Sequence, residues 1–168
     1  MIKVFSSRKF KSILAVLAIF VCISNLTNEA YASSKSTKLS SNQKIEKVIS
    51  LANKQLGKKY KYGATGPKNF DCSGLTYYCF KNAVGQTIPR TSSQQSKKGK
   101  YISISKLKRG DLVFFGNKKT KKVSHVALYI GNNKFIHSPK PGDVVRIDSM
   151  KTSYYKNRAL HGRRFFGN

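Results

Sequence analysis

One cysteine and two histidines are the residues of this chain whose chemical types could together break a covalent bond. Cys72 lies in the run FDCSGL at 70–75, and the histidines follow at positions 125 and 137. A thiol needs a base to become a strong nucleophile, and the base needs a further group to orient it. One interpretation of the pattern makes Cys72 the nucleophile, His125 the base and acid, and His137 the group that holds the ring of His125.

A helix is expected to position the thiol. Residues 72–84 carry apolar side chains at helical spacing, Asp71 is a good N-cap residue and Gly85 is a good helix stop. Cys72 then lies at a helix N-terminus, where unpaired N–H groups and the helix dipole favour a thiolate. We expect a lowered pKa for Cys72 and a backbone N–H that binds an oxyanion. The alternative, a buried and inert cysteine, is the commoner role of a single cysteine.

A hairpin is expected to position the histidines. They lie twelve residues apart, with the turn signal Gly131-Asn132-Asn133 between them. In a hairpin with a three-residue loop, both side chains lie on one face of the sheet as opposite or diagonal neighbours. A two-residue loop shifts the register by one residue and puts them on opposite faces. The spacing leaves open whether the pair serves catalysis or makes structural hydrogen bonds within the sheet.

The remaining pattern is typical of an α+β fold. Apolar residues at helical spacing predict a first helix from about 43 to 56, with its N-cap at Ser41 or Asn42 and its stop at Gly57. Residues 91–98 suit a short polar helix or a loop. Strand patterns follow at 112–115, 123–130, 134–138, 144–147 and 159–166. Helices first and an antiparallel sheet afterwards is the α+β arrangement.

Several separate motifs resemble the NlpC/P60 family of cell-wall cysteine peptidases. They are YKYGA at 60–64, FDCSGL at 70–75, PRTS at 89–92, LKRGDLVFF at 107–115, HVALYIG at 125–131 and FIHS at 135–138. The resemblance covers about 45–166 in the family's order. It implies a papain-like domain in which N-terminal helices pack on an antiparallel sheet of about five strands. It also implies a triad of Cys72, His125 and His137.

The resemblance assigns four further residues to the neighbourhood of the thiol. Tyr62 matches a tyrosine beside the cysteine, where it contacts substrate or the oxyanion. Asp71, Ser73 and Arg90 match positions that often line the cleft, and their alternative roles are helix cap, first-turn residue and loop anchor. No cofactor is implied, and no cluster of Cys and His has the spacing of metal ligands.

By this resemblance, the chain is expected to hydrolyse peptidoglycan. The expected bond lies in the stem peptide, between γ-D-glutamate and the following diamino acid, and is cleaved through an acyl-enzyme. Two other interpretations stay open. The same thiol could serve amidase, transpeptidase or acyltransferase chemistry, or the chain could be a basic wall-binding protein without catalysis.

The first 32 residues have the pattern of an export signal. A basic start is followed by the apolar run 13–23 and by Ala30-Tyr31-Ala32, a small-residue cleavage site before Ser33. The expected organisation is a signal peptide at 1–32, a flexible linker at 33–42 and a catalytic domain at 43–168. We expect a secreted, extracellular or wall-associated monomer that keeps no stable membrane anchor after processing.

Charge and cysteine content complete the expectations. Removal of 1–32 leaves 29 of the 33 Lys and Arg residues and 5 of the 6 Asp and Glu residues, a formal charge of +24. Such a field attracts polyanions, which for an exported protein are expected to be anionic wall polymers. No nucleic-acid motif is present, so no nucleic-acid partner is expected. Cys72 and Cys79 are too far apart along one helix for a disulfide, so both are expected to be free thiols.

Overall fold

The computed structural model describes residues 38–167 of the 168-residue chain. The expected signal peptide at 1–32 and the first part of the expected linker, 33–37, lie outside the described residues. Within 38–167, every helix is too short or too polar to cross a membrane.

The first helix, α2, spans Ser41–Asn53. It begins there because Ser40 forms a capping box with Gln43: the Ser40 hydroxyl accepts the Gln43 N–H, and the Gln43 amide accepts the Ser40 N–H. The cap is one residue earlier than expected. The helix also ends before the expected stop at Gly57, because the backbone then forms tighter turns: the Gln55 N–H donates to the Ala52 carbonyl at 3.0 Å and the Leu56 N–H to the Asn53 carbonyl at 3.1 Å.

The second long helix, α3, spans Cys72–Val84, as the sequence predicts. It ends at Gly85, which adopts the left-handed conformation with φ of 69°. Cys79 is buried on its inner face, and burial raises the pKa of this thiol to about 12. Both Cys72 and Cys79 are free, as expected. Short helical segments follow: α4 (Ser92–Gln95), the 3₁₀ turn η1 (Ile104–Lys106) and α5 (Ser153–Lys156).

The sheet has six antiparallel strands in the order β1-β6-β2-β3-β4-β5. Their bounds are β1 Lys100–Ile102, β2 Leu112–Gly116, β3 Val123–Gly131, β4 Lys134–His137, β5 Arg146–Ser149 and β6 Ala159–Arg164. The sequence predicted five of them, and missed the three-residue edge strand β1. It also started β5 too early, because Val144 and Val145 pair with the segment 57–60 and not with β4.

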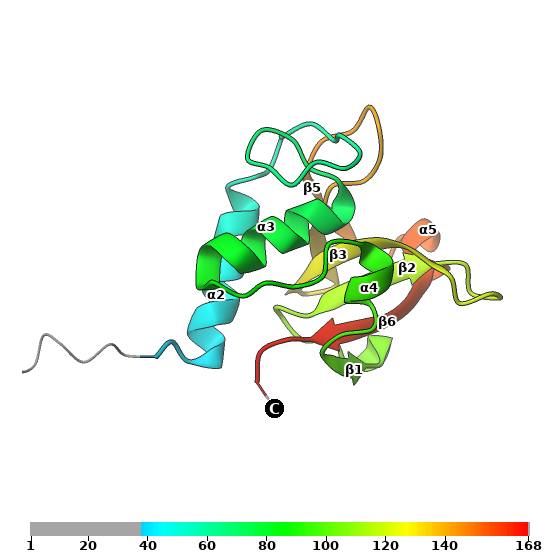
Figure 1. The fold of residues 1–168 in the computed structure, drawn as a ribbon. Coiled ribbons are helices and arrows are strands. Elements are labelled where there is room, and N and C mark those ends of the chain that lie inside the picture. The colour runs from blue at the N-terminus through cyan, green and yellow to red at the C-terminus, as the bar shows by residue number, and fades with distance from the viewer. Residues whose placement is uncertain (1–37, 168) are drawn as a thin grey trace, which may run out of the picture. The chain divides into compact units, whose positions relative to one another are not determined.

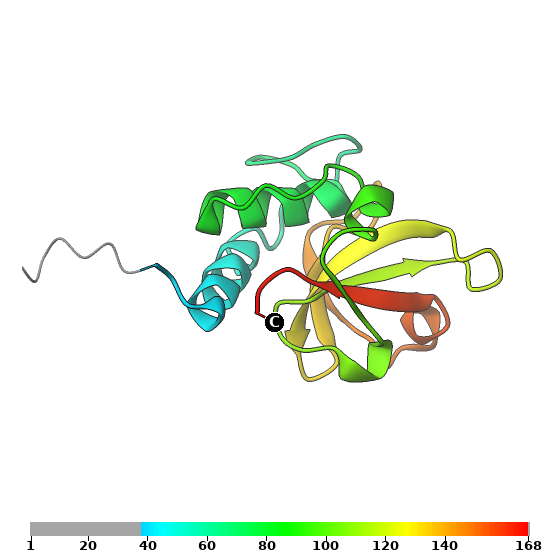
Figure 2. The ribbon, with the colours of Figure 1, turned by 60° about the horizontal axis from the view of Figure 1, so that its bottom comes forward.

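Each face of the sheet carries its own apolar cluster. On one face, α2 and α3 cover Leu112, Phe114, Val126, Leu128 and Ile136. Figure 2 shows these two helices together on one side and the twisted sheet on the other. On the opposite face, a smaller cluster packs near η1 and α5, and α5 lies behind the strands in Figure 1. The fold is thus an α+β arrangement of N-terminal helices on an antiparallel sheet, with one strand more than expected.

Candidate active site

Cys72 is the first residue of α3, at the point where the helix meets the loop 61–69. Asp71 caps this helix by accepting the Gly74 N–H at 2.6 Å. The Asp71 N–H in turn donates to the carbonyl of Ala64 at 3.0 Å, which brings the loop onto the helix. A Cβ at Gly74 would lie only 2.0 Å from that carbonyl oxygen. Glycine at this position therefore permits the close contact between the loop and the helix that carries the thiol.

Asp71 is the centre of a closed polar network. The guanidinium of Arg90 donates to both carboxylate oxygens, Ser73 donates at 3.2 Å and the Gly63 N–H donates at 2.9 Å. Burial by itself would raise the pKa of Asp71, but the Arg90 ion pair and these N–H groups outweigh it and hold that pKa below its ordinary value. Three predicted cleft residues, Asp71, Ser73 and Arg90, thus come together. Here they bind one another and fix the start of α3.

The electrostatics of the thiol differ from the expectation. Burial raises the pKa of Cys72, and the negative charge of Asp71 raises it further. The backbone N–H groups of Val126, Ser73 and Cys72 itself favour the thiolate, but they do not outweigh desolvation. The predicted lowering of this pKa is therefore wrong. A resting thiol of this kind keeps its proton, and it needs a nearby base to become a nucleophile.

Val126 brings the thiol and the histidines to the same part of the sheet. Its backbone N–H, which directly follows His125 in the chain, lies close enough to the sulfur to lower the pKa of Cys72. The ring of His125 itself lies against Phe115, on the face away from the long helices. Within 38–167, no hydrogen bond joins the thiol and the imidazole directly. Catalytic hydrogen bonds of this type are often long without substrate and shorten when substrate binds.

The register of the β3–β4 hairpin puts both histidines on one face, although the loop has two residues. Asn132 and Asn133 form the turn with positive φ values of 51° and 58°, and Gly131 pairs with Lys134. A bulge between Tyr129 and Gly131 then shifts the pairing by one residue. The predicted rule for a two-residue loop is thus overridden by the bulge. His125 and His137 become diagonal neighbours whose ring centroids are 5.1 Å apart.

A chain of hydrogen bonds assigns the proton positions on the two rings. The Asp148 carboxylate can only accept, so Nε2 of His137 donates to it, at 3.0 Å. Nδ1 of a neutral His137 must then accept, and Nε2 of His125 donates to it at 2.8 Å. The remaining nitrogen, Nδ1 of His125, carries no proton in this arrangement. His125 is thus a neutral base with one free lone pair.

Burial keeps both rings neutral. It lowers the pKa of His125 to about 3. The positive charge that His137 carries when protonated and the charge of Arg158 lower this pKa as well, whereas the negative charge of Asp148 opposes them. Burial also lowers the pKa of His137 to about 4, although the hydrogen bond and charge of Asp148 oppose this. Both imidazoles are therefore unprotonated at neutral pH, as the hydrogen-bond chain requires.

Sequence reasoning missed the residues behind the histidines. Asp148 on β5 is diagonal to His137 and also accepts from the Tyr155 hydroxyl at 2.8 Å and from Arg146 at 3.1 Å. Burial would raise the pKa of Asp148, but these donors together with His137 lower it. Asp148 could have been found from the rarity of acidic residues in this chain. Only five of them remain after residue 32, so each was a candidate partner for a histidine. The prediction nevertheless ended the strand at Ile147, one residue before it.

Comparison with known proteins identifies the family to which this chain belongs. A family model described as the NlpC/P60 family matches residues 57–164. The chain belongs to the NlpC/P60 family. The NlpC/P60 domain is 40% identical over 128 residues to the murein DD-endopeptidase MepH of Escherichia coli, covering 72% of this chain and 47% of that protein. It is 38% identical to the γ-D-glutamyl-L-lysine dipeptidyl-peptidase of Bacillus subtilis, covering 72% and 41%.

A solved structure extends the comparison to the fold. The NlpC/P60 domain matches the crystal structure of an NlpC/P60 family protein from Bacillus cereus with a TM-score of 0.70 and 36% identity, covering 73% of this chain and 40% of that one. The chain spans about half the length of the curated relatives it matches. Family membership and the papain-like α+β fold are thus established for the domain itself.

Two openings of the NlpC/P60 domain lie near the candidate residues. Tyr62, the last of the predicted site residues, is 86% exposed on the loop 61–69, next to the Gly63 N–H that Asp71 holds. Its contact with substrate stays a prediction. A cavity of about 570 Å³ lies against His125 and His137, and the cations Lys140 and Arg158 line it. Within 38–167, no group of three or more His, Cys, Asp or Glu side chains could hold a metal ion.

Proposed function

We propose that this protein is a secreted peptidoglycan hydrolase, a cysteine endopeptidase that cleaves a stem-peptide bond. The observation that carries the proposal is the hydrogen-bond chain from Asp148 through His137 to His125, which leaves Nδ1 of His125 free to take a proton. A thiol hydrolase needs a thiol that can be activated and a neutral base that can take its proton, and the domain supplies both. The name of the Escherichia coli relative, a murein endopeptidase, supports peptidoglycan as the substrate.

The reaction follows from these proton positions. Nδ1 of His125 takes the Cys72 proton as the sulfur attacks the carbonyl carbon of the stem-peptide amide, and the backbone N–H of Cys72 is the candidate donor to the oxyanion. When the tetrahedral intermediate collapses, the C–N bond breaks and His125 gives its proton to the leaving amine. A thioester remains on Cys72. His125 then removes a proton from water, which attacks the thioester, and release of the carboxylic acid returns the proton to the sulfur.

His137 and Asp148 act through His125 in this scheme. The imidazolium that forms on His125 donates from Nε2 to His137, and the negative charge of Asp148 stabilises the positive charge through His137. Since burial disfavours a charged imidazole, this support matters most during the moments when His125 holds the extra proton. We therefore propose Cys72, His125 and His137 as the triad, with Asp148 as the positioning residue behind it.

The bond that we propose lies between γ-D-glutamate and the following diamino acid. The name of the Bacillus subtilis relative supports this bond, whereas the name of the Escherichia coli relative denotes a DD-endopeptidase. The choice can be tested by mass spectrometry of defined peptidoglycan fragments incubated with purified protein, beside a Cys72→Ala control. The expected result is a product pair separated at the γ-D-glutamyl bond, formed only with the thiol present.

Other products of that experiment would change the proposal. Cleavage at a D,D cross-link would support a hydrolase but would show that the γ-D-glutamyl bond is not the one cleaved. Transfer of the acyl group to an added amine, without hydrolysis, would indicate a transferase. Identical fragments with both proteins, over several wall types, would contradict catalysis by Cys72. Export has a separate test: the N-terminal sequence of protein collected outside the cell should begin at Ser33, and a start at Met1 would contradict the signal peptide.

A further inference from the structure

In this domain, arginines form the ion pairs with acidic side chains, and lysines do not. Every acidic side chain of residues 38–167 forms an ion pair with an arginine. The pairs are Glu46–Arg109, Asp71–Arg90, Asp111–Arg164, Asp143–Arg146 and Asp148–Arg146. No lysine of the described residues takes part in an ion pair. The positive charge that lacks a partner inside the domain therefore resides mainly on lysine ammonium groups.

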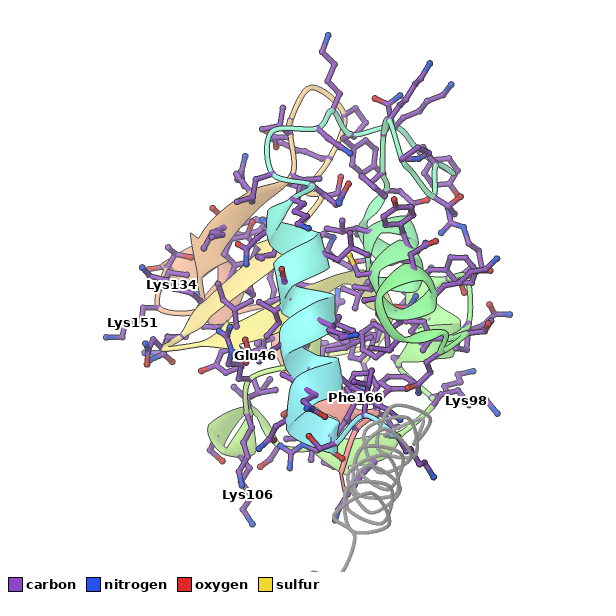
Figure 3. The ribbon with its side chains drawn as sticks, turned by 90° about the vertical axis from the view of Figure 1, so that its left-hand side faces the viewer. Glu46, Lys98, Lys106, Lys134, Lys151 and Phe166 are labelled. Atoms are coloured by element: carbon purple, nitrogen blue, oxygen red, sulfur yellow. The ribbon has the colours of Figure 1, made fainter. Side chains whose placement is uncertain are left out.

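Three of these lysines line one groove at the edge of the sheet. The groove has a volume of about 670 Å³ and is formed by β1, η1 and the segment before β2, with Lys100, Lys106 and Lys108 around it. None of the three ammonium groups makes a hydrogen bond to another described residue. Figure 3 shows Lys106 extending from the body of the domain, far from Lys134 and Lys151 on another edge. The groove thus concentrates cationic groups that nothing in the described chain neutralises.

The other polar groups of the groove are suited to phosphate or hydroxyl oxygens. Ser103 and Ser105 lie in the groove, and their hydroxyls are exposed and hydrogen-bonded to each other at 3.3 Å. The only guanidinium in the groove, that of Arg164, is already bound to both oxygens of the buried Asp111, at 2.7 and 2.8 Å. Lysine binds phosphate as a mobile point charge, whereas arginine recognises planar groups through its rigid fork.

We propose that this groove binds the phosphate groups of a polyol-phosphate or sugar-phosphate polymer of the cell wall. Lys100, Lys106 and Lys108 would each neutralise a phosphate, and the serine hydroxyls would bond to phosphate or polyol oxygens. The choice of a wall polymer rests on the proposed function, because it assumes that the protein acts at the wall. The chemistry of the groove itself requires only a flexible polyanion with regularly spaced phosphates.

The groove favours such a polymer over nucleic acid. Base edges are read by free arginine, asparagine or glutamine side chains, and bases stack on open aromatic rings. The groove has no uncommitted guanidinium and no amide side chain. Its aromatic residue, Tyr101, is 59% exposed, but its ring already stacks on His161, with centroids 5.5 Å apart, and lies under the guanidinium of Arg163. The available contacts are therefore with charge and hydroxyl groups, and not with bases.

The position of the groove also lets a bound polymer coexist with substrate. The groove lies at β1, the outermost strand, and β6 and β2 separate that strand from β3, which carries His125. A polymer held there leaves the candidate active site open. The groove would then serve as a tether that keeps the enzyme on the wall while stem peptides enter and leave the site.

Binding of poly(glycerol phosphate) as a function of salt tests this site. We expect the variant K100Q/K106Q/K108Q to bind about tenfold more weakly at low salt, and the slope of log affinity against log salt to fall by about 2, because three phosphate contacts are lost. The matched control K54Q/K134Q/K151Q removes the same charge from exposed positions outside the groove. It should stay close to wild type in both affinity and slope.

The outcomes separate the groove from the catalytic proposal. Equal weakening by both triple variants, or no binding by wild type, would overturn the groove as a site. Equally tight binding of a single-stranded oligonucleotide of the same charge would overturn the assignment to a wall polymer. Hydrolysis of small soluble fragments should be unchanged in K100Q/K106Q/K108Q, and Cys72→Ala should retain polymer binding. Loss of hydrolysis alone would therefore refute only the proposed function.

Discussion

The two halves of the candidate site are built on the same pair of residue types, used in different ways. On the thiol side, Asp71 is held by Arg90 and acts on the backbone, since it caps α3 and binds the loop 61–69. On the imidazole side, Asp148 is held by Arg146 and acts on a side chain, since it binds the ring of His137. Asp71 thus stabilises the backbone around the thiol, and Asp148 determines which nitrogen of His137 carries the proton.

This difference predicts different consequences when each half is disturbed. The Asp71 network is closed and only 6% of Asp71 is exposed, so its loss should mainly cost folding stability. The Asp148 chain ends at a free ring nitrogen, so its loss should mainly cost activity. The two halves also differ in whether their arginine has an ion-pair partner. Arg90 is paired with Asp71, whereas Arg158 near His125 has no acidic partner within the described residues.

The largest effect is expected from the base itself. His125→Ala removes the only group that can take the Cys72 proton in the proposed mechanism, so kcat/KM should fall at least about 10⁴-fold. Steady-state hydrolysis of the fragment identified by mass spectrometry measures it. His161→Ala is the matched control, because His161 lies on β6 outside the site and should leave kcat/KM close to wild type. Near-normal activity of His125→Ala would refute its role as base.

The next effect comes from the carboxylate behind the histidines. Asp148→Asn keeps the shape but removes the negative charge that supports the imidazolium, so kcat should fall about 10- to 100-fold with KM little changed. Separate determination of kcat and KM checks this, with thermal unfolding measured in parallel. If the variant loses stability but keeps kcat, Asp148 is a structural residue and the contrast with Asp71 fails.

Arg158 should affect binding of substrate and not the chemical step. It lines the cavity beside the imidazoles, where its guanidinium lies 5.1 Å from the ring centroid of Tyr154. Stem peptides carry carboxylates that an unpaired cation can bind, so Arg158→Ala should raise KM about fivefold to tenfold with kcat nearly constant. Lys134→Ala, a cation on the exposed end of β4, is the matched control. A fall in kcat at constant KM would instead assign Arg158 to the chemical step.

On the thiol side, Asp71 should change stability in two steps. Asp71→Ala removes both the helix cap and the Arg90 partner, so the free energy of unfolding should fall by about 2–4 kcal/mol. Asp71→Asn retains a capping side chain and should cost about half as much. Urea unfolding measures both values, and kcat of the folded variants should fall less than in Asp148→Asn. Equal losses from Asn and Ala would show that the cap contributes little.

The same contrast explains what the sequence could predict. The thiol side could be predicted because Asp71, Cys72 and Gly74 belong to one short segment. The residue types of that segment indicate both the helix cap and the helix. The histidine side depends on tertiary register. Whether the two rings share a face was decided by the bulge near Gly131, for which the turn signal gave no indication. The carboxylate behind them escaped notice because the pairing of 144–145 with 57–60 moved β5 to Arg146–Ser149.

The failed prediction for the Cys72 thiol has the same origin. The helix N-terminus is a local feature and does favour the thiolate, as the sequence argument held. Burial depends on what packs around the sulfur, and only the assembled fold determines it. Since burial raises this pKa and lowers those of both histidines, the site rests as a neutral pair. In the proposed mechanism, charge then develops mainly when substrate is bound and proton transfer begins.

The last expected effect concerns stability toward acid and follows from the buried neutral histidines. The pKa values of His125 and His137 fall from 6.5 to about 3 and about 4 on folding, so the unfolded chain binds more protons as the pH drops below 6.5. The stability that these neutral rings contribute is therefore present above pH 6.5 and is lost as the pH falls toward 4 for His137 and toward 3 for His125, by about 2 kcal/mol per histidine between pH 7 and 5. Urea unfolding at these two pH values measures the loss, and His125→Gln should reduce it by about half, because glutamine does not titrate. An equal loss in His125→Gln would mean that His125 is not held neutral by burial, and the neutral resting pair would then have to be abandoned.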